Sequence, residues 1–98
     1  MLDENKRDAL AHFKYNEKLT NGLSFSMALE ALKCGLCINR RGWNGKGLYV
    51  KMYEDITLKG GYEVSAMFIL HYPDGTVFTW VPSISDLLAN DWEVSYCD

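Results

Sequence analysis

Residues 24–50 read SFSMALEALKCGLCINRRGWNGKGLYV, and within them the hydrophobic period changes from that of a helix to that of a strand. The first part carries apolar residues at positions i, i+3, i+4 and i+7, namely Phe25, Ala28, Leu29 and Leu32. This spacing places them on one face of a helix. Ser24 or Ser26 can cap the first turn, and Gly35 suits a left-handed C-terminal cap. We therefore predict a helix across residues 24–35.

After Gly35 the hydrophobic period becomes two, which predicts strands. The segments with this character are residues 36–41, 48–53, 64–72, 76–81 and 91–96. The third of them, VSAMFILHY, is the most apolar, and we place it at the centre of a sheet. Pro73, Asp74 and Gly75 predict a hairpin turn after it, because proline presets φ and glycine accepts a positive φ.

The remaining segments predict two further helices. Residues 82–90, PSISDLLAN, predict a short one, with Ser83 and Asp86 forming a capping box in which Asp replaces the usual Glu. Residues 2–20 carry apolar residues at helical spacing among many charges, which predicts a helical arm that ends at the TNG of residues 20–22.

These elements define an α+β fold. We expect a small antiparallel β-sheet with one longer helix packed on it, a short C-terminal helix and an N-terminal helical arm. The domain organisation follows from the same elements. Residues 1–22 are predicted to form an N-terminal helical extension, and residues 23–98 a single α+β domain.

Composition limits the function classes. With 98 residues, 48% of them hydrophobic and 23% charged, the chain predicts one soluble domain with little interior for a deep cavity. A ligand is therefore expected at the surface or between copies of the chain. The net charge of -3 and pI of about 5.3 argue against a nucleic-acid polymer as partner.

The sequence also predicts the compartment. No apolar run is long enough to cross a bilayer, and the first residues lack the apolar segment of a signal peptide. We therefore expect a cytoplasmic protein without a membrane partner. In that compartment the three cysteines are predicted to be reduced thiols.

No residue pattern predicts a metal site, a cofactor site or a catalytic site. Cys34 and Cys37 have zinc-ligand spacing, but a second paired motif is missing, so buried free cysteines are favoured. The GWNGKG loop departs from a Walker motif in glycine spacing and in the residue after Lys46. We interpret His71 as structural, because nothing in the sequence supplies a partner for a catalytic base. The chain is predicted not to be an enzyme.

The tryptophans allow two interpretations. Trp92 alternates with Val94 and Tyr96 and predicts a core position, whereas Trp43 lies on a glycine-rich basic loop and Trp80 near a strand end. The structural interpretation makes Trp43 a lid over the sheet and Trp80 a core residue or subunit contact. The functional interpretation makes both an aromatic platform for a flat base, where stacking contributes about 1–3 kcal/mol per base.

Polar groups beside this platform would complete a site for a base that carries a phosphate. Successive glycine amides can form an anion-binding nest, to which Arg41 and Lys46 add positive charge. Asn44 and Asp86 could read polar edges of the ligand.

Two blocks, SFSMALEALKCGLCINRRGWNGKGLYV and DGTVFTWVPSISDLLANDWEV, resemble the phage-encoded Thoeris anti-defence proteins of the second type. The hallmarks of that family are an ALEALKxG helix, an RxGWNGKG loop and a DGxxxxWxPSxxDLLAxDWE ending. The resemblance covers residues 23 to 96. The chain departs from the family in residues 1–22, which precede the usual start, and in residues 53–62, which replace a proline-containing insert.

The resemblance implies a non-catalytic sponge. Such proteins hold the cyclic ADP-ribose isomer made by the Thoeris sensor, glycocyclic ADP-ribose, and assemble as homotetramers with ligand pockets between subunits. Carried over to this chain, the ligand-binding residues are Trp43, Asn44, Lys46, Trp80, Ser83 and Asp86. The two tryptophans would sandwich or flank the adenine, and amides near Gly45 with Arg41 or Lys46 would meet the diphosphate.

Two alternatives remain open. The same platform could hold cyclic di- or trinucleotide signals instead. The chain could also be a phage structural or adaptor protein, in which the aromatic residues serve only an oligomer interface.

Overall fold

The protein, as a computed structural model, is described over residues 21–43 and 47–97. Its elements are α2 (Phe25–Lys33), β1 (Cys37–Arg40), β2 (Tyr49–Thr57), β3 (Glu63–His71), β4 (Val77–Thr79), α3 (Ile84–Leu88) and β5 (Trp92–Ser95). The helix predicted over residues 2–20 lies outside the described residues. Within them, no helix combines the length and the apolar character that a membrane span needs.

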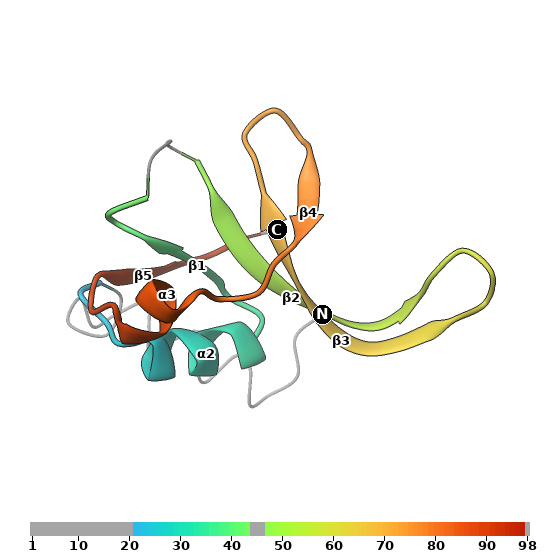
Figure 1. Cartoon of the computed structure of the whole chain (residues 1–98), viewed down its shortest axis with the longest axis horizontal. Coiled ribbons are helices and arrows are strands. Elements are labelled where there is room, and N and C mark those ends of the chain that lie inside the picture. Colours follow the sequence, from blue (N-terminus) through green and yellow to red (C-terminus); the bar gives the residue numbers. More distant parts are fainter. Residues whose placement is uncertain (1–20, 44–46, 98) are drawn as a thin grey trace.

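The strands form one five-stranded antiparallel sheet in the order β4-β3-β2-β1-β5 (Figure 1). Helix α2 lies along one face of the sheet, with α3 beside it (Figure 1). The α+β class, the antiparallel sheet and its two helices are therefore confirmed. Strand β3 lies inside the sheet, paired with β2 on one side and β4 on the other, as the apolar residues 64–72 predict. The middle strand of the five is β2.

The local signals around α2 act as predicted. The Ser24 side chain accepts a hydrogen bond from the Met27 amide at 3.4 Å, which caps the first turn. Gly35 follows the C-cap with φ of 86°, a left-handed conformation that favours glycine. The helix buries Ala28, Ala31 and Leu32 against the sheet.

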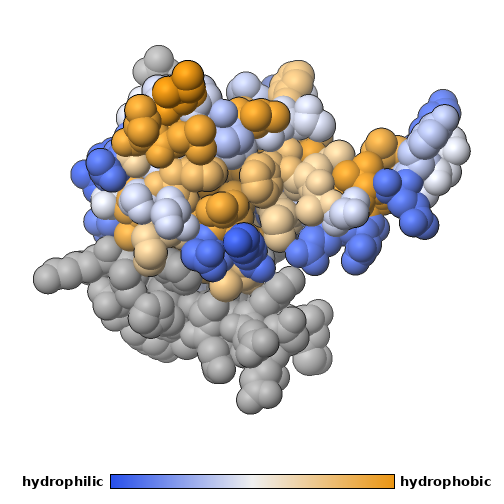
Figure 2. All heavy atoms as spheres, turned by 60° about the horizontal axis from the view of Figure 1, so that its bottom comes forward, coloured by the Kyte–Doolittle hydropathy of each residue, from blue (hydrophilic) through white to orange (hydrophobic). Residues whose placement is uncertain are grey.

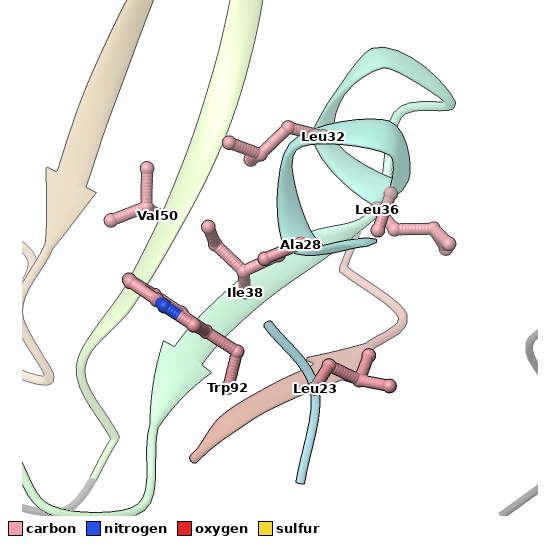
Figure 3. Packing of buried hydrophobic residues seen from close by; sticks show 8 residues of the cluster. Leu23, Ala28, Leu32, Leu36, Ile38, Val50 and Trp92 are labelled. Carbon is pink, nitrogen blue, oxygen red and sulfur yellow. The ribbon is translucent and has the colours of Figure 1, made fainter. Parts of the chain in front are cut away.

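The core lies between α2 and the middle of the sheet (Figure 3). Trp92 of β5 is fully buried there and packs with Leu32, Ile38 and Val50. Burial of each such side chain contributes about 1.5–3 kcal/mol. The inward position predicted for Trp92 is confirmed. Tyr96 does not share it and is 56% exposed, because β5 ends at Ser95.

The β2–β3 hairpin is longer than predicted. The sequence predicts a first strand that ends at residue 53, but β2 continues to Thr57, which pairs with Glu63 of β3. Backbone hydrogen bonds between strands form regardless of side-chain charge, so the polar residues of this segment still extend the ladder. The hairpin projects from the body of the domain (Figure 1), and its far end is largely hydrophilic (Figure 2).

Strand β4 is shorter than the predicted residues 76–81. Its pairing ends at Thr79, which lies opposite Ile69. The Trp80 amide still donates to the carbonyl of Phe68 at 2.9 Å, but the chain then turns away towards α3. The ring of Trp80 lies near Phe25 of α2 and Phe68 of β3.

The cysteine prediction was wrong for two of the three thiols. Cys37 and Cys97 form a disulfide. Strand β5 pairs with β1 so that Ser95 lies opposite Cys37, and two residues later Cys97 comes to the same face. Their Cα atoms are 5.7 Å apart, within the range that a disulfide requires. Cys34 is not part of this bond.

We expect one thiol per chain to react with Ellman's reagent when the protein is purified without reductant and denatured. After reduction the number should be three, and a Cys97→Ser variant should give two without reductant because Cys37 loses its partner. Three reactive thiols in the unreduced protein would contradict the disulfide and show that all three cysteines are reduced.

Candidate ligand-binding site

Three tryptophans from distant parts of the chain meet at one end of the core. Trp43 follows β1, Trp80 follows β4, and both are half-buried. Their ring centroids are 6.3 Å apart, and the ring planes are inclined by 69°. Buried Trp92 lies against both, with its centroid 5.4 Å from that of Trp43 and 6.1 Å from that of Trp80. Through these edge-to-face contacts the buried Trp92 ring supports Trp43 and Trp80, the two outer rings, on the side that faces the core.

Two shallow hollows adjoin the outer rings. An apolar hollow of about 190 Å³ is lined by Trp43, Leu48, Leu70 and Trp80. A more polar one, of about 270 Å³, shares Trp43 and Leu48 and adds Asn39, Arg40, Arg41 and Glu93. Each volume is below that of a typical drug-sized pocket, roughly 300–1,000 Å³. A nucleotide-sized ligand would therefore extend beyond either hollow.

The ring geometry bears on the two predicted ways of holding a base. A sandwich requires two parallel faces, whereas Trp43 and Trp80 of one chain meet edge to face. This arrangement suits a flanking contact better than a sandwich within one chain, and both stay predictions.

Arg41 lies at the rim of the polar hollow. Its side chain is 66% exposed, and Nε lies 3.7 Å from Oε2 of Glu93. The Glu93 carboxylate also accepts a hydrogen bond from the Asn39 side chain at 3.0 Å. Three other predicted site residues, Asn44, Gly45 and Lys46, lie outside the described residues.

Ser83 and Asp86 form the predicted capping box at the start of α3. The Ser83 hydroxyl accepts from the Asp86 amide at 3.1 Å, and the Ser83 amide donates to Oδ2 of Asp86 at 2.9 Å. Asp86 is 7% exposed, and its carbonyl accepts a hydrogen bond from the Trp92 indole at 2.9 Å. Ser83 is exposed. The hydrogen bonds of Asp86 are thus made to other residues of the chain. A direct contact of Ser83 or Asp86 with ligand stays a prediction.

Arg40 is a site residue that sequence reasoning missed. Its Nη1 donates to Oδ1 of Asp86 at 3.1 Å, and its Nε donates to Oδ1 of Asp91 at 2.8 Å. The guanidinium thereby joins the end of β1 to α3 and to the start of β5. The RxGWNGKG hallmark contains this arginine, but its partners are 46 and 51 residues away, so no local pattern could identify them.

Arg40, Asp86 and Asp91 shift one another's pKa values. Hydrogen bonds to Asp91 and then Asp86 raise the pKa of Arg40. The bond from Arg40 lowers the pKa of Asp91. Burial raises the pKa of Asp86, but hydrogen bonds from Ser83, Arg40 and the Trp43 side chain outweigh it, so the net pKa is lowered. All three groups are therefore charged at neutral pH.

His71 lies away from this site, on the sheet face that carries Tyr49 and Tyr53. Its ring stacks on Tyr49 at 4.6 Å, and Nε2 lies 2.9 Å from the Tyr53 hydroxyl. Burial, with a smaller effect of Lys51, lowers its pKa. These contacts are consistent with the structural interpretation of His71, which stays a prediction.

The Cys34–Cys37 pair does not offer two thiolates, because Cys37 is bonded to Cys97. In the part of the chain that the structure describes, no three His, Cys, Asp or Glu residues are grouped as metal ligands.

A family model described as the Thoeris anti-defense 2-like domain matches residues 23–95 of the chain. The chain is also 31% identical over 83 residues to the Thoeris anti-defense 2 protein of Bacillus phage SP01. That alignment covers 74% of this chain and 93% of the phage protein. The region of the chain that the family model matches includes all three tryptophans and the residues that form the Arg40 ion pairs.

The ion pairs predict a defined acid response. Because folding lowers the pKa of Asp86 and Asp91, their stabilisation is present above the unfolded pKa of about 3.9 and is lost as pH falls through the lower folded pKa. We expect the free energy of unfolding, measured with urea, to decrease below about pH 4. Asp91→Asn should flatten this decrease, whereas Glu30→Gln controls for the change in net charge. An unchanged pH profile in Asp91→Asn would contradict the assignment.

Proposed function

The chain belongs to the Thoeris anti-defense 2-like family, and from this premise we propose that it sequesters a cyclic ADP-ribose-type immune signal without cleaving it. The observation that carries the proposal is the pair of half-buried indoles, Trp43 and Trp80, beside an open apolar hollow. Holding the signal in the infected cytoplasm would keep the Thoeris effector inactive. Sequestration needs tight equilibrium binding and no chemical step.

The apolar hollow suits the base of such a ligand. Leu48 and Leu70 line it between the two indoles, so a planar base could lie against one indole face and contact the other ring at its edge. Stacking of a base on an aromatic side chain contributes about 1–3 kcal/mol. Support from Trp92 keeps the outer rings in place, which reduces the entropy lost on binding.

The polar hollow suits the diphosphate and the ribose groups. Arg41 makes only a long, exposed ion pair with Glu93, which contributes little to stability, so its guanidinium is available to a phosphate. Lys46 and the amides near Gly45 belong to the same loop in sequence and would add to this charge. Glu93 would repel a phosphate, and we place it against ribose hydroxyls, which donate to carboxylates.

We further propose that the sites are completed in a homotetramer. Each hollow is too small to enclose a cyclic dinucleotide-sized ligand, so a second chain would have to cover it. The chain also exposes apolar residues on α3 and just before it: Val81, Ile84, Leu87 and Leu88. Exposed apolar residues that gather in this way mark interaction surfaces.

A non-catalytic role is consistent with the charges near Trp43. Arg40 pairs with both Asp86 and Asp91, and the raised pKa of Arg40 and the lowered pKa values of the two carboxylates keep these groups from exchanging protons near neutral pH. His71 is engaged with Tyr53 on another face. Among the described residues of the two hollows, this leaves Glu93 as the remaining carboxylate.

The second candidate ligand is a cyclic di- or trinucleotide. It shares the base and phosphate chemistry, and the two hollows alone do not distinguish it. A thermal-shift panel of cyclic nucleotides would separate the candidates, because only a bound ligand raises the melting temperature.

We expect isothermal titration calorimetry with glycocyclic ADP-ribose to show saturable binding. Heating the complex should then release the ligand with unchanged mass, because no bond is broken. Release of a cleaved product would show an enzyme instead. An absence of binding heat and of any thermal shift across the panel would favour the adaptor alternative.

Trp43→Ala is expected to weaken binding by roughly 5-fold to 150-fold, the equivalent of one lost stacking contact. The mass in analytical ultracentrifugation should remain that of wild type, four chains under our proposal. Tyr96→Ala removes an exposed ring at the opposite end of β1 and serves as the matched control, with wild-type affinity expected. If Trp43→Ala changed the assembly instead of the affinity, the adaptor alternative would be supported.

A further inference from the structure

The turn that carries Trp43 is anchored to a residue far along the chain. The amide of Gly42, directly before Trp43, donates to Oδ2 of Asp91 at 2.9 Å. The amide of Arg41 donates to the carbonyl of the same aspartate at 3.0 Å. The Trp43 amide donates to the carbonyl of Arg40 at 3.1 Å. Three consecutive amides therefore have fixed partners, and Asp91 supplies two of them.

Arg40 in turn holds Asp91. Oδ1 of Asp91 accepts from Nε of Arg40 at 2.8 Å, which leaves Oδ2 directed to the Gly42 amide. The same guanidinium binds Asp86 at 3.1 Å. The backbone of the turn before Trp43 is thus restrained through Asp91, and the Trp43 ring packs edge to face on the buried ring of Trp92.

Gly42 is required by this contact rather than by its backbone conformation. It is not among the residues with positive φ. A Cβ at this position would lie 2.9 Å from Oδ2 of Asp91, closer than a real Cβ contact allows. A side chain at residue 42 would therefore displace the carboxylate that anchors the turn.

The arrangement does more than stabilise the fold. Partly buried ion pairs contribute little net stability, because desolvation offsets most of their attraction. The side chains of Arg40 and Asp91 are 21% and 31% exposed, so their ion pair is partly buried. The main effect of these short, charge-assisted hydrogen bonds is to fix the position of the groups that Arg40 and Asp91 bind, especially the Gly42 amide.

We propose that Arg40 and Asp91 are positioning residues that hold the Gly42–Trp43 turn so that the Trp43 ring borders both hollows. They act through Trp43 and need not touch ligand. The effect on affinity rests on the proposed function, whereas the effect on the Trp43 ring does not.

The test compares Asp91→Asn and Arg40→Lys with Glu30→Gln, a control that breaks the exposed Glu30–Lys33 pair on α2. Asn removes the charge of Asp91, and Lys keeps the charge of Arg40 but lacks the fork that reaches two carboxylates. In ligand-free protein, the NMR signal of the Trp43 indole N–H should shift or broaden in both variants. Hydrogen exchange at the Gly42 amide should accelerate by roughly 10-fold to 100-fold, as expected for loss of a charge-assisted bond. The control should change neither.

A third variant distinguishes release of the anchor from unfolding caused by a lost charge. Gly42→Ala keeps every charged group and should produce the same Trp43 signal change, because it displaces the carboxylate sterically. Combined with Asp91→Asn it should add little, since both changes release the same anchor. For glycocyclic ADP-ribose, all three variants should weaken binding by roughly 10-fold to 100-fold.

The outcomes separate the two proposals. If wild type binds none of the cyclic nucleotides, the proposed function fails, and the Trp43 signal and the Gly42 exchange still decide the positioning role. If the variants lose thermal stability while the Trp43 signal and Gly42 exchange stay as in wild type, the residues are merely structural and the inference is overturned. Wild-type affinity in Asp91→Asn together with a displaced Trp43 would also overturn it.

Discussion

The described structure depends on one guanidinium between two carboxylates. Arg40 ends β1, and its two contacts bring Asp86 of α3 and Asp91 before β5 to the same point. Because the guanidinium is planar and its donors are fixed in direction, binding both acids restricts how the three segments lie relative to one another. Asp86 also completes the capping box of α3, and Asp91 binds the turn before Trp43. The helix start, the strand start and the tryptophan loop are therefore placed together.

A second constraint connects this charged group to the core. The Trp92 indole donates to the carbonyl of Asp86, and its ring is fully buried beneath Trp43 and Trp80. The outer rings are therefore extensions of the core that remain open on one side. This explains why a large aromatic residue follows a basic turn next to a glycine: the ring is supported from below, and the turn lets it reach the surface.

The family and the site point to the same kind of function. A chain of 98 residues buries one small core, so a ligand as large as the proposed cyclic nucleotide would have to lie at the surface. Those hollows combine two indoles, aliphatic walls and an exposed arginine. Such a surface can bind a base and a phosphate, and we propose that the family's anti-Thoeris role is achieved in this way, between copies of the chain.

The sequence alone determined the features that depend on near neighbours. The helix at residues 24–35 with its Ser24 cap and Gly35, and the Ser83–Asp86 capping box, follow from contacts within four residues. The two motifs also identified the family, which the comparisons confirm. Only the tertiary structure decided the partners of Arg40, the Cys37–Cys97 disulfide and the edge-to-face meeting of Trp43 with Trp80. These contacts join residues 37 to 60 positions apart, and their geometry arises from strand register and sheet order, which periodicity within one segment does not encode.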